Sequence, residues 1–290
     1  MIQVHKNSNT PPALATVQTS IEPQLLQRKE RFRWQTQHYS VPIKKELDDL
    51  YHSKCAFCEQ KLTNYDNGQL FTVEHYRPKS IYWWLGNEWT NLFPTCQTCN
   101  DNKEDEFNLR YGKKRRVMDP ILLPSGTINR TACNASATHF IKEEPVFIHP
   151  EIEQPEQFFV FLPTGEMAIK EGLSAWEQSR AKTMLDKFLN RHSLVEKRLT
   201  RINALQDDLQ RAIDTFRRVI GYGAYDNNHV KLCFFPFLEK LFASNAPQME
   251  FSRLGYFMSN PSTFATFFLE DYNEEVQQLI LEAIQLYTTT

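Results

Sequence analysis

Two pairs of cysteines constrain this chain more than any other feature of its sequence. Cys55 and Cys58 form one C-x-x-C pair, and Cys96 and Cys99 form a second. Four thiolates suit a tetrahedral zinc ion, because thiolate is a soft, strong ligand and zinc imposes no geometry of its own. A closed site leaves no position for substrate, so we expect the zinc to be structural. The alternatives are four unrelated buried cysteines or a redox pair, although neither pair follows a βαβ pattern.

The composition narrows the class of protein. The 290 residues are enough for one large or two modest domains, and 33 Lys and Arg against 35 Asp and Glu give a net charge of −2. This balance excludes a globally basic nucleic-acid binder but permits a local basic groove. No apolar run reaches the ~18–20 residues of a membrane span, and residues 1–20 do not resemble a signal peptide. We therefore expect a soluble, cytoplasmic protein that binds no membrane and keeps its cysteines reduced.

We divide the chain into three segments by composition and pattern. Residues 1–50 comprise a polar, proline-punctuated arm, expected to be loosely held, and a helix. The arm leads into a short basic cluster between Arg28 and Arg33. Residues 51–120 carry both cysteine pairs and most of the candidate chemistry. Residues 121–290 form an accessory region that we expect to dock a partner.

The accessory region begins with short β-like runs and continues with helices. The runs are residues 138–141, 146–149 and 158–162. A capping box at Ser174 and Glu177, followed by apolar stripes of helical period, predicts helices from there onward. The fold class is therefore α+β, with a zinc-stapled module embedded in a predominantly helical chain.

Two adjacent polar residues between the cysteine pairs are candidates for catalysis. Glu74 and His75 end a β-like run at residues 71–75, and Pro78 follows closely. Neighbouring residues on a regular strand point to opposite faces, so both can serve one site only if the strand ends or distorts there. Pro78 and the restricted residue before it favour such an end.

A second strand and a helix complete this region. The strand is expected at residues 88–93 and includes Asn91, and the helix is expected at residues 96–106. Asn100 and Lys103 share one face of this helix because they are three residues apart. The order strand, loop, strand, helix brings a carboxylate, a histidine and two asparagines to the junctions between elements.

This combination resembles the HNH, or ββα-metal, endonuclease motif, with Glu74-His75, Asn91 and Asn100 at the matching positions. The strings KCAFCE, VEHYRPK, YWWLGNEWTNL and CQTCNDNK are also similar to the PtuB family. These are the HNH nuclease subunits of Septu-type anti-phage systems, which also occur as effectors in some retrons. The resemblance covers residues 50–120 and extends with less similarity to about residue 200.

The resemblance implies a metal-dependent endonuclease that hydrolyses phosphodiester bonds of DNA or tRNA as the effector of a defence complex. It implies His75 as the general base, Glu74 and Asn100 as ligands of a catalytic Mg²⁺ or Mn²⁺, and Asn91 as a brace for the loop that carries the base. Histidine suits this role because its ordinary pKa lies near physiological pH. Oxygen ligands favour hard ions over zinc. The implied partners are a PtuA-like ATPase and, in a retron, the reverse transcriptase with its msDNA.

Basic side chains near the motif are candidates for contacts with nucleic acid. We expect phosphate contacts from Arg77, Lys79, Lys103, Lys113, Lys114, Arg115 and Arg116. Such contacts give affinity that is independent of base sequence and falls steeply with salt. Five of the basic residues near the motif form a basic run, which comprises Arg110, Lys113, Lys114, Arg115 and Arg116. The alternative for this basic run is a solvated loop. The aromatic cluster of Tyr82, Trp83, Trp84 and Trp89 is expected to be core rather than a platform for bases.

Two other functions compete with the nuclease. A zinc-stapled subunit that binds nucleic acid or assembles a complex without catalysis would need none of the four motif residues, so their joint presence argues against it. A catalytic zinc hydrolase is disfavoured because the chain contains no H-E-x-x-H motif. Residues 236–242 and 251–256 are apolar enough either to dock a partner or to form the core of the helical region.

Overall fold

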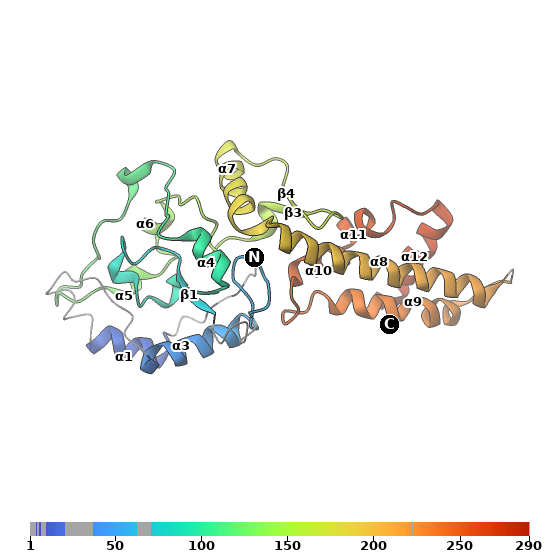
Figure 1. Cartoon of the computed structure of the whole chain (residues 1–290), viewed down its shortest axis with the longest axis horizontal. Helices are drawn as coiled ribbons and strands as arrows, with labels where there is room; N and C mark the ends of the chain where they lie inside the picture. Colours follow the sequence, from blue (N-terminus) through green and yellow to red (C-terminus); the bar gives the residue numbers. More distant parts are fainter. Residues whose placement is uncertain are drawn as a thin grey trace. The chain divides into compact units, whose positions relative to one another are not determined.

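The computed structural model divides the chain into two units (Figure 1). The first unit comprises Met1–Phe159 and Ile169–Leu189, and the second comprises Val160–Ala168 and Asn190–Thr290. The structure describes residues 4, 6, 10–20, 37–62, 71–221 and 223–289. The basic cluster between Arg28 and Arg33 lies outside these residues. The predicted accessory region, residues 121–290, contributes to both units, so the units do not follow its boundary.

The described part of the N-terminal arm is packed into the first unit, which corrects the expectation of a loosely held arm. Val4 and Leu14 are buried. The ammonium group of Lys6 is also buried, 2.9 Å from the carboxylate of Glu151 and 2.8 Å from the carbonyl oxygen of Trp89. An ion pair and a backbone acceptor together compensate the loss of water around this charge. The helices that follow are α1 (Pro12–Ser20) and α3 (Gln37–Leu50).

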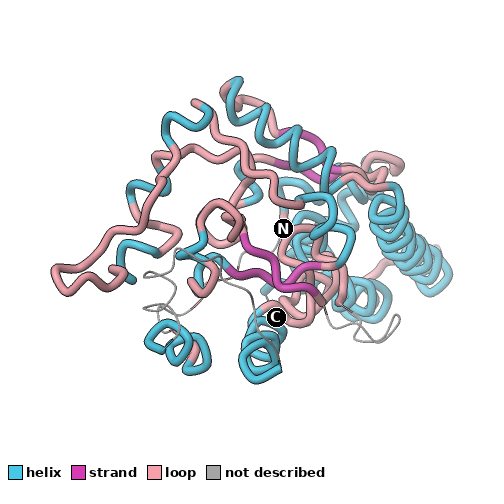
Figure 2. The backbone as a smooth tube through the Cα atoms, turned by 60° about the vertical axis from the view of Figure 1, so that its left-hand side comes forward, coloured by secondary structure: helices cyan, strands magenta, loops and turns pink. Residues whose placement is uncertain are grey.

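A two-stranded antiparallel sheet lies at the centre of the predicted module (Figure 2). Its strands are β1 (Thr72–His75) and β2 (Leu92–Thr95), and the seven-residue helix α4 (Gln97–Lys103) follows directly. The second strand was expected at residues 88–93. Residues Trp89–Asn91 form a 3-10 turn instead, because the side chain of Glu88 accepts a hydrogen bond from the amide of Thr90 and caps it.

Aromatic side chains fill the space around this sheet. Tyr76 packs edge-on against Phe93, Phe107 and His149, with ring centroids 4.4–6.3 Å apart. Tyr82, Trp84 and Trp89 are buried, which confirms that the aromatic cluster is mostly core. Such packing is needed because a two-stranded sheet is at best marginally stable alone.

Two of the strands expected in the accessory region are absent from the described structure. Residues Thr138–Ile141 form the short helix α6, and residues 146–149 form no strand. The carbonyl oxygens of Val146 and Phe147 instead accept hydrogen bonds from the guanidinium of Arg180, and that of Phe147 accepts another from the hydroxyl of Tyr76. Side chains from distant segments thus satisfy these carbonyl oxygens, while the amide of Val146 donates to the backbone carbonyl oxygen of Asn108 at 2.8 Å. The short helix α5 (Arg130–Cys133) precedes this segment.

The third expected strand is present as half of a hairpin. β3 (Phe159–Phe161) and β4 (Met167–Ile169) form a second two-stranded sheet, joined by a turn at Gly165. Gly165 has a φ of +82°, and a Cβ at this position would lie 2.5 Å from the carbonyl oxygen of Val195. The turn therefore requires glycine both for its backbone conformation and for close packing.

The remaining chain is helical, as predicted. The capping box of Ser174 and Glu177 begins α7 (Ala175–Met184), and a π-helical turn at Leu185–Leu189 ends the first unit. The second unit contains α8 (His192–Ile220), α9 (Asn227–Ala243), α10 (Ser252–Ser259), α11 (Pro261–Phe268) and α12 (Glu274–Thr289). Phe237, Leu241, Phe251 and Leu254 are buried. The apolar segments 236–242 and 251–256 therefore contribute mainly to the core of this unit.

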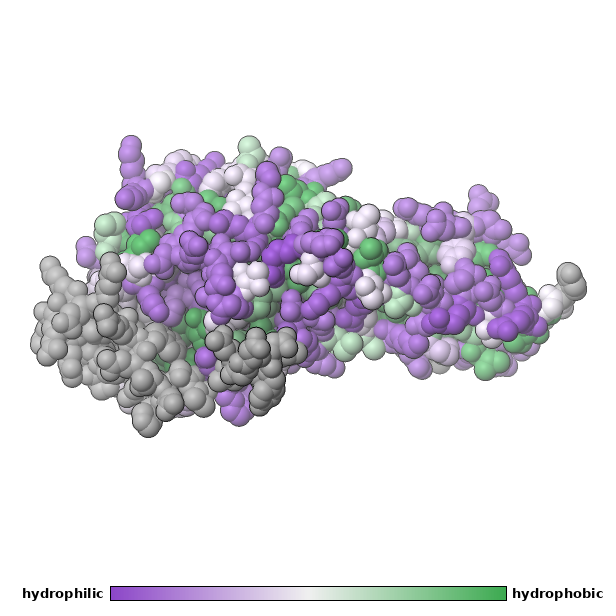
Figure 3. Space-filling view, viewed as in Figure 1, coloured by the Kyte–Doolittle hydropathy of each residue, from purple (hydrophilic) through white to green (hydrophobic). Residues whose placement is uncertain are grey.

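The surface shown in Figure 3 is mostly hydrophilic, with hydrophobic side chains scattered among the polar ones. None of the helices in the described part of the chain combines the length and the hydropathy needed to cross a bilayer.

Candidate functional site

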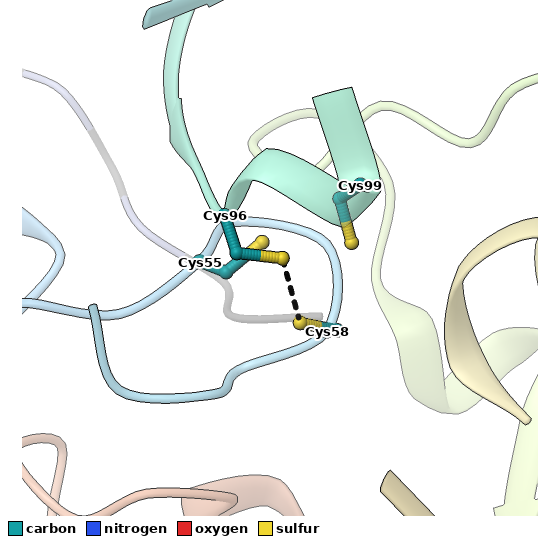
Figure 4. Close-up of side chains that lie close together, drawn as sticks. All are labelled: Cys55, Cys58, Cys96 and Cys99. Carbon is teal, nitrogen blue, oxygen red and sulfur yellow. Dashed lines mark hydrogen bonds between the residues drawn. The ribbon is translucent and has the colours of Figure 1, made fainter. Parts of the chain in front are cut away.

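The four cysteines of the two C-x-x-C pairs come together in the first unit (Figure 4). Their sulfur atoms all lie within 4.8 Å of one another, and the Sγ atoms of Cys58 and Cys96 are 3.8 Å apart. A tetrahedral zinc ion with Zn–S bonds of about 2.3 Å places its sulfur ligands about 3.8 Å apart. The cluster therefore fits a structural zinc ion in both ligand type and spacing.

Backbone hydrogen bonds hold the first cysteine pair against the sheet. The amide of Ala56 donates to the carbonyl oxygen of Pro94 in β2 at 2.9 Å, and the amide of Cys55 donates to that of Gln60 at 3.0 Å. Cys96 precedes α4 and Cys99 lies in its first turn. The cluster thus joins the turn after α3 to the end of the sheet and the start of α4.

An open cleft beside this cluster collects four of the predicted site residues. Glu74, His75, Lys79 and Asn100 line the cleft, which has a volume of about 710 Å³. Glu74 and His75 both face it because β1 ends at His75, where the regular alternation of side chains stops.

The ring of His75 is oriented by the backbone of the loop that follows. Its Nε2 atom lies 2.9 Å from the carbonyl oxygen of Gly86. A carbonyl oxygen can only accept, so Nε2 carries the proton and Nδ1 holds the lone pair of the neutral ring. Burial, with the charge of Lys79 as a second cause, lowers the pKa of His75 to about 3. The imidazole is therefore neutral at pH 7, and in this buried state it is a weaker base than an ordinary histidine.

Asn91 ties together the loop between the two strands. Its side-chain oxygen accepts from the amide of Arg77 at 2.7 Å, and its Nδ2 donates to the carbonyl oxygens of Arg77 at 3.0 Å and Leu85 at 3.1 Å. Beside it, the amide of Tyr76 donates to the carbonyl oxygen of Asn91 at 2.9 Å. These hydrogen bonds fix the backbone directly after His75.

Lys103 does not face solvent, which corrects its prediction as a phosphate contact. The side chain is fully buried, with Nζ 2.7 Å from Oε1 of Glu74 and 3.0 Å from the carbonyl oxygen of His75. Burial raises the pKa of Glu74, and the charge of Lys103 opposes this shift. Lys103 therefore positions the two candidate catalytic residues from the buried side of the segment.

Arg77 is likewise turned inward and does not make the predicted contact with nucleic acid. It is 2% exposed, and its Nε atom lies 2.8 Å from Oε2 of Glu143. A second guanidinium nitrogen donates to the carbonyl oxygen of Phe140 at 3.0 Å. Among the predicted phosphate contacts near the catalytic pair, the exposed Lys79 alone lies at the cleft surface.

The predicted basic run is divided between paired and solvent-facing side chains. Arg115 lies 2.8 Å from the carboxylate of Glu144, and Arg116 donates to the carbonyl oxygen of Phe107 at 3.2 Å. Lys113 and Lys114 are exposed in the 3-10 turn Gly112–Arg115. These two lysines are the members of the run best placed to meet a phosphate backbone.

Three charged residues of the cleft were missed by sequence reasoning. Lys44 of α3, Glu104 and Asp105 also line it. Glu104 and Asp105 directly follow the observed helix α4 and lie within the predicted helix, so their position next to Asn100 and Lys103 was a usable signal. Lys44 carried no such signal, because it reaches the cleft only through the packing of α3.

Comparison with known proteins agrees with this geometry. The HNH endonuclease family model matches residues 55–106. The Septu protein PtuB of Bacillus mycoides (strain KBAB4) is 27% identical over 152 residues, 47% of this chain and 44% of that protein. The Septu protein PtuB of Bacillus thuringiensis is 29% identical over 115 residues, 40% of each chain. The Septu protein PtuA of Bacillus mycoides (strain KBAB4) is 24% identical over 166 residues, 54% of this chain and 20% of that protein.

Residues 55–106 therefore form an HNH endonuclease domain, in which the sheet, the helix α4 and the cysteine cluster are the structural parts. Segments of 152 and 115 residues of the chain are related to the Septu protein PtuB. The chain spans less than half the length of the curated relatives that it matches.

Replacing one cysteine of the cluster tests the zinc site. We expect Cys58→Ser to lose bound zinc and to melt at a lower temperature. Zinc binding, worth about 10–16 kcal/mol in zinc-finger peptides, is available only to the folded chain. Metal analysis and thermal melting measure both effects. The matched control is Cys133→Ser, which alters a buried thiol outside the cluster and should keep its zinc. Full zinc content in the Cys58 variant would contradict the site.

Replacing Lys103 separates a structural role from a phosphate contact. Lys103→Met leaves the carboxylate of Glu74 buried without its cation, so we expect a loss of about 3–5 kcal/mol in the free energy of unfolding. Urea denaturation measures this loss. The double variant Glu74→Gln with Lys103→Met should recover part of it, because the uncompensated charge is gone. A single variant that unfolds like the wild type would show that the pair does not support the fold.

Proposed function

We propose that this chain is a metal-dependent HNH endonuclease that hydrolyses phosphodiester bonds. The observation that carries the proposal is the convergence of Glu74, His75 and Asn100 on one open cleft of the HNH domain. Glu74 and Asn100 offer oxygen ligands of the kind that Mg²⁺ or Mn²⁺ prefers, and these two residues would hold the ion. Because Oε1 of Glu74 is held by Lys103, Oε2 would be the ligand atom.

In the proposed reaction His75 accepts a proton at Nδ1 from the attacking water. The water oxygen forms a bond to phosphorus while the bond to the leaving 3′ oxygen breaks in line. The hydrogen bond from Nε2 to Gly86 keeps the ring in the tautomer that this step needs. When bound, the metal ion supplies charge stabilisation at the phosphate and at the leaving oxygen. Asn91 and Lys103 act by positioning the backbone of this segment.

The biological setting belongs to the same proposal. Similarity to the Septu proteins supports a role as the nuclease of an anti-phage defence complex that acts in the cytoplasm with a PtuA-like ATPase. A retron with its reverse transcriptase and msDNA is a second setting compatible with this relationship. The substrate we propose is nucleic acid, with DNA and tRNA as the two candidates.

The cleavage assay uses plasmid DNA and total tRNA in parallel, each with and without Mg²⁺ or Mn²⁺. We expect metal-dependent cutting by the wild-type chain, together with the partner ATPase where it is required. His75→Ala should stay folded and lose about 10²–10⁴-fold in rate, the usual contribution of a general base. Binding without cutting by the wild type under every condition would favour the alternative, a zinc-stapled subunit without catalysis. Full activity in the His75 variant would remove this residue as the base.

The exposed lysines of the basic run are tested through salt dependence. We expect Lys113→Gln with Lys114→Gln to weaken binding to all sequences alike. The slope of log affinity against log salt should become shallower by about 1–2, because each lost phosphate contact contributes about 0.7–0.9. Fluorescence anisotropy at salt concentrations between about 50 and 200 mM measures the slope. The control is Lys45→Gln with Lys182→Gln, which removes two exposed lysines in helical i,i+4 ion pairs and should leave the slope unchanged.

A further inference from the structure

A second cavity in the first unit takes no part in the proposed mechanism. Its volume is about 390 Å³, within the ~300–1,000 Å³ of small-molecule sites. Its buried lining includes Tyr76, Arg77, Phe140, His149 and Arg180. Its exposed or partly exposed lining includes Arg110, Ile141, Glu144, Ile152 and Trp176. Helices α6 and α7, which contribute to this lining, are labelled in Figure 1.

The charges around this cavity are paired within the protein. Each of the three arginines that line it forms an ion pair with a glutamate. The pairs are Arg110 with Glu144 at 2.8 Å, Arg180 with Glu153 at 2.6 Å, and Arg77 with Glu143 at 2.8 Å. Such a lining favours a ligand group without a net charge over a phosphate, because an anion would have to compete with three carboxylates.

The exposed side of the cavity offers flat surfaces for a planar ligand. Trp176 is partly exposed, and the guanidinium carbon of Arg110 lies 5.7 Å from the centroid of its ring. Aromatic rings and guanidinium planes are the groups on which unpaired nucleobases stack. The exposed side chains of Ile141 and Ile152 add apolar surface at the same opening.

The buried side of the cavity includes the neutral imidazole of His149. Nδ1 of His149 accepts from the amide of Glu151 at 3.2 Å, so the neutral ring carries its proton on Nε2. This Nε2 atom is buried without a partner of standard geometry in the described structure. Burial lowers the pKa of the ring, and a backbone hydrogen bond to Thr90 raises this pKa in opposition.

The surroundings of the cavity connect it to the candidate active site and to the basic run. Tyr76 and Arg77, which line the cavity, directly follow Glu74 and His75, which line the catalytic cleft. On the other side, Lys113 and Lys114 are exposed only three and four residues beyond Arg110. A strand held by these lysines would pass the cavity close to the segment that carries the catalytic base.

We propose that this cavity binds one unpaired nucleobase of the nucleic acid that the neighbouring cleft cleaves, with the base stacked on Trp176. This inference rests on the proposed nuclease function and narrows its substrate class. A base inside a continuous duplex is already stacked and paired, so the cavity selects single-stranded, looped or locally opened nucleic acid.

The experiment measures binding without turnover, in the full-length His75→Ala background. Three labelled probes are compared by fluorescence anisotropy: a single-stranded oligonucleotide, the same strand with abasic sites, and its perfect duplex. We expect the intact strand to bind about tenfold more tightly than the abasic strand, a typical contribution of one stacked base. Trp176→Ala should abolish this ratio and leave duplex binding unchanged, and Trp176→Phe should restore most of it.

The matched control is Trp83→Ala, which removes another partly exposed tryptophan of the same unit that does not line the cavity. It should keep the ratio between intact and abasic strands. Because Trp176→Ala could unfold the unit, Arg110→Gln provides a second variant at the opening, with the same expected loss. Thermal melting establishes that each variant is folded.

Three results would overturn the proposal. The first is an equal affinity of the His75→Ala chain for intact and abasic strands. The second is a ratio that does not change when Trp176→Ala is added to a chain that stays folded. The third is an equal loss of affinity for all three probes in that double variant. The first result would leave the apolar opening as a surface for a protein partner. Failure of the nuclease proposal is a separate result, because it is measured as absence of cleavage by the chain that contains His75. It does not depend on whether intact and abasic strands bind with different affinity.

Discussion

The cluster of four cysteines is the constraint on which the first unit depends. Two four-residue strands and a seven-residue helix are too short to be stable by themselves. The cluster joins the turn before the sheet to the beginning of α4, and the amide of Ala56 extends this connection to Pro94 in β2. The cleft lies on these joined elements. The cysteines therefore determine the geometry of the site without lining it.

Buried polar contacts then determine which way the reacting groups face. Lys103 reaches from α4 to both the side chain of Glu74 and the backbone of His75, and Asn91 holds the backbone that follows. Burying an ammonium group and an amide is costly unless each finds partners, and here the partners belong to the catalytic segment. The contacts that stabilise this segment therefore also fix the position of His75, the candidate base.

The sequence predicted the local parts of this arrangement and failed where distant contacts decide. The cysteine spacing, the end of β1 at His75 and the capping box of α7 depend on neighbours in the chain, and the structure contains all three. The inward turn of Arg77 depends on Glu143, far along the chain, and a basic residue beside a catalytic pair carries no sign of it. Residues 138–141 read as a strand from their β-branched and aromatic composition, but they form a helix in the fold. Local propensity is a weak guide where tertiary contacts override it.

The segment from Glu74 to Arg77 has a different environment on each side, and this explains why it is so heavily braced. Glu74 and His75 line the candidate catalytic cleft, whereas Tyr76 and Arg77 line the second cavity. A rotation that displaced this backbone by two residues would exchange the two sets of side chains, placing the guanidinium of Arg77 where the imidazole of His75 lies. Asn91 holds both backbone polar groups of Arg77, which is the point where such a rotation would begin. Bracing at this residue therefore protects the catalytic geometry and the shape of the second cavity together.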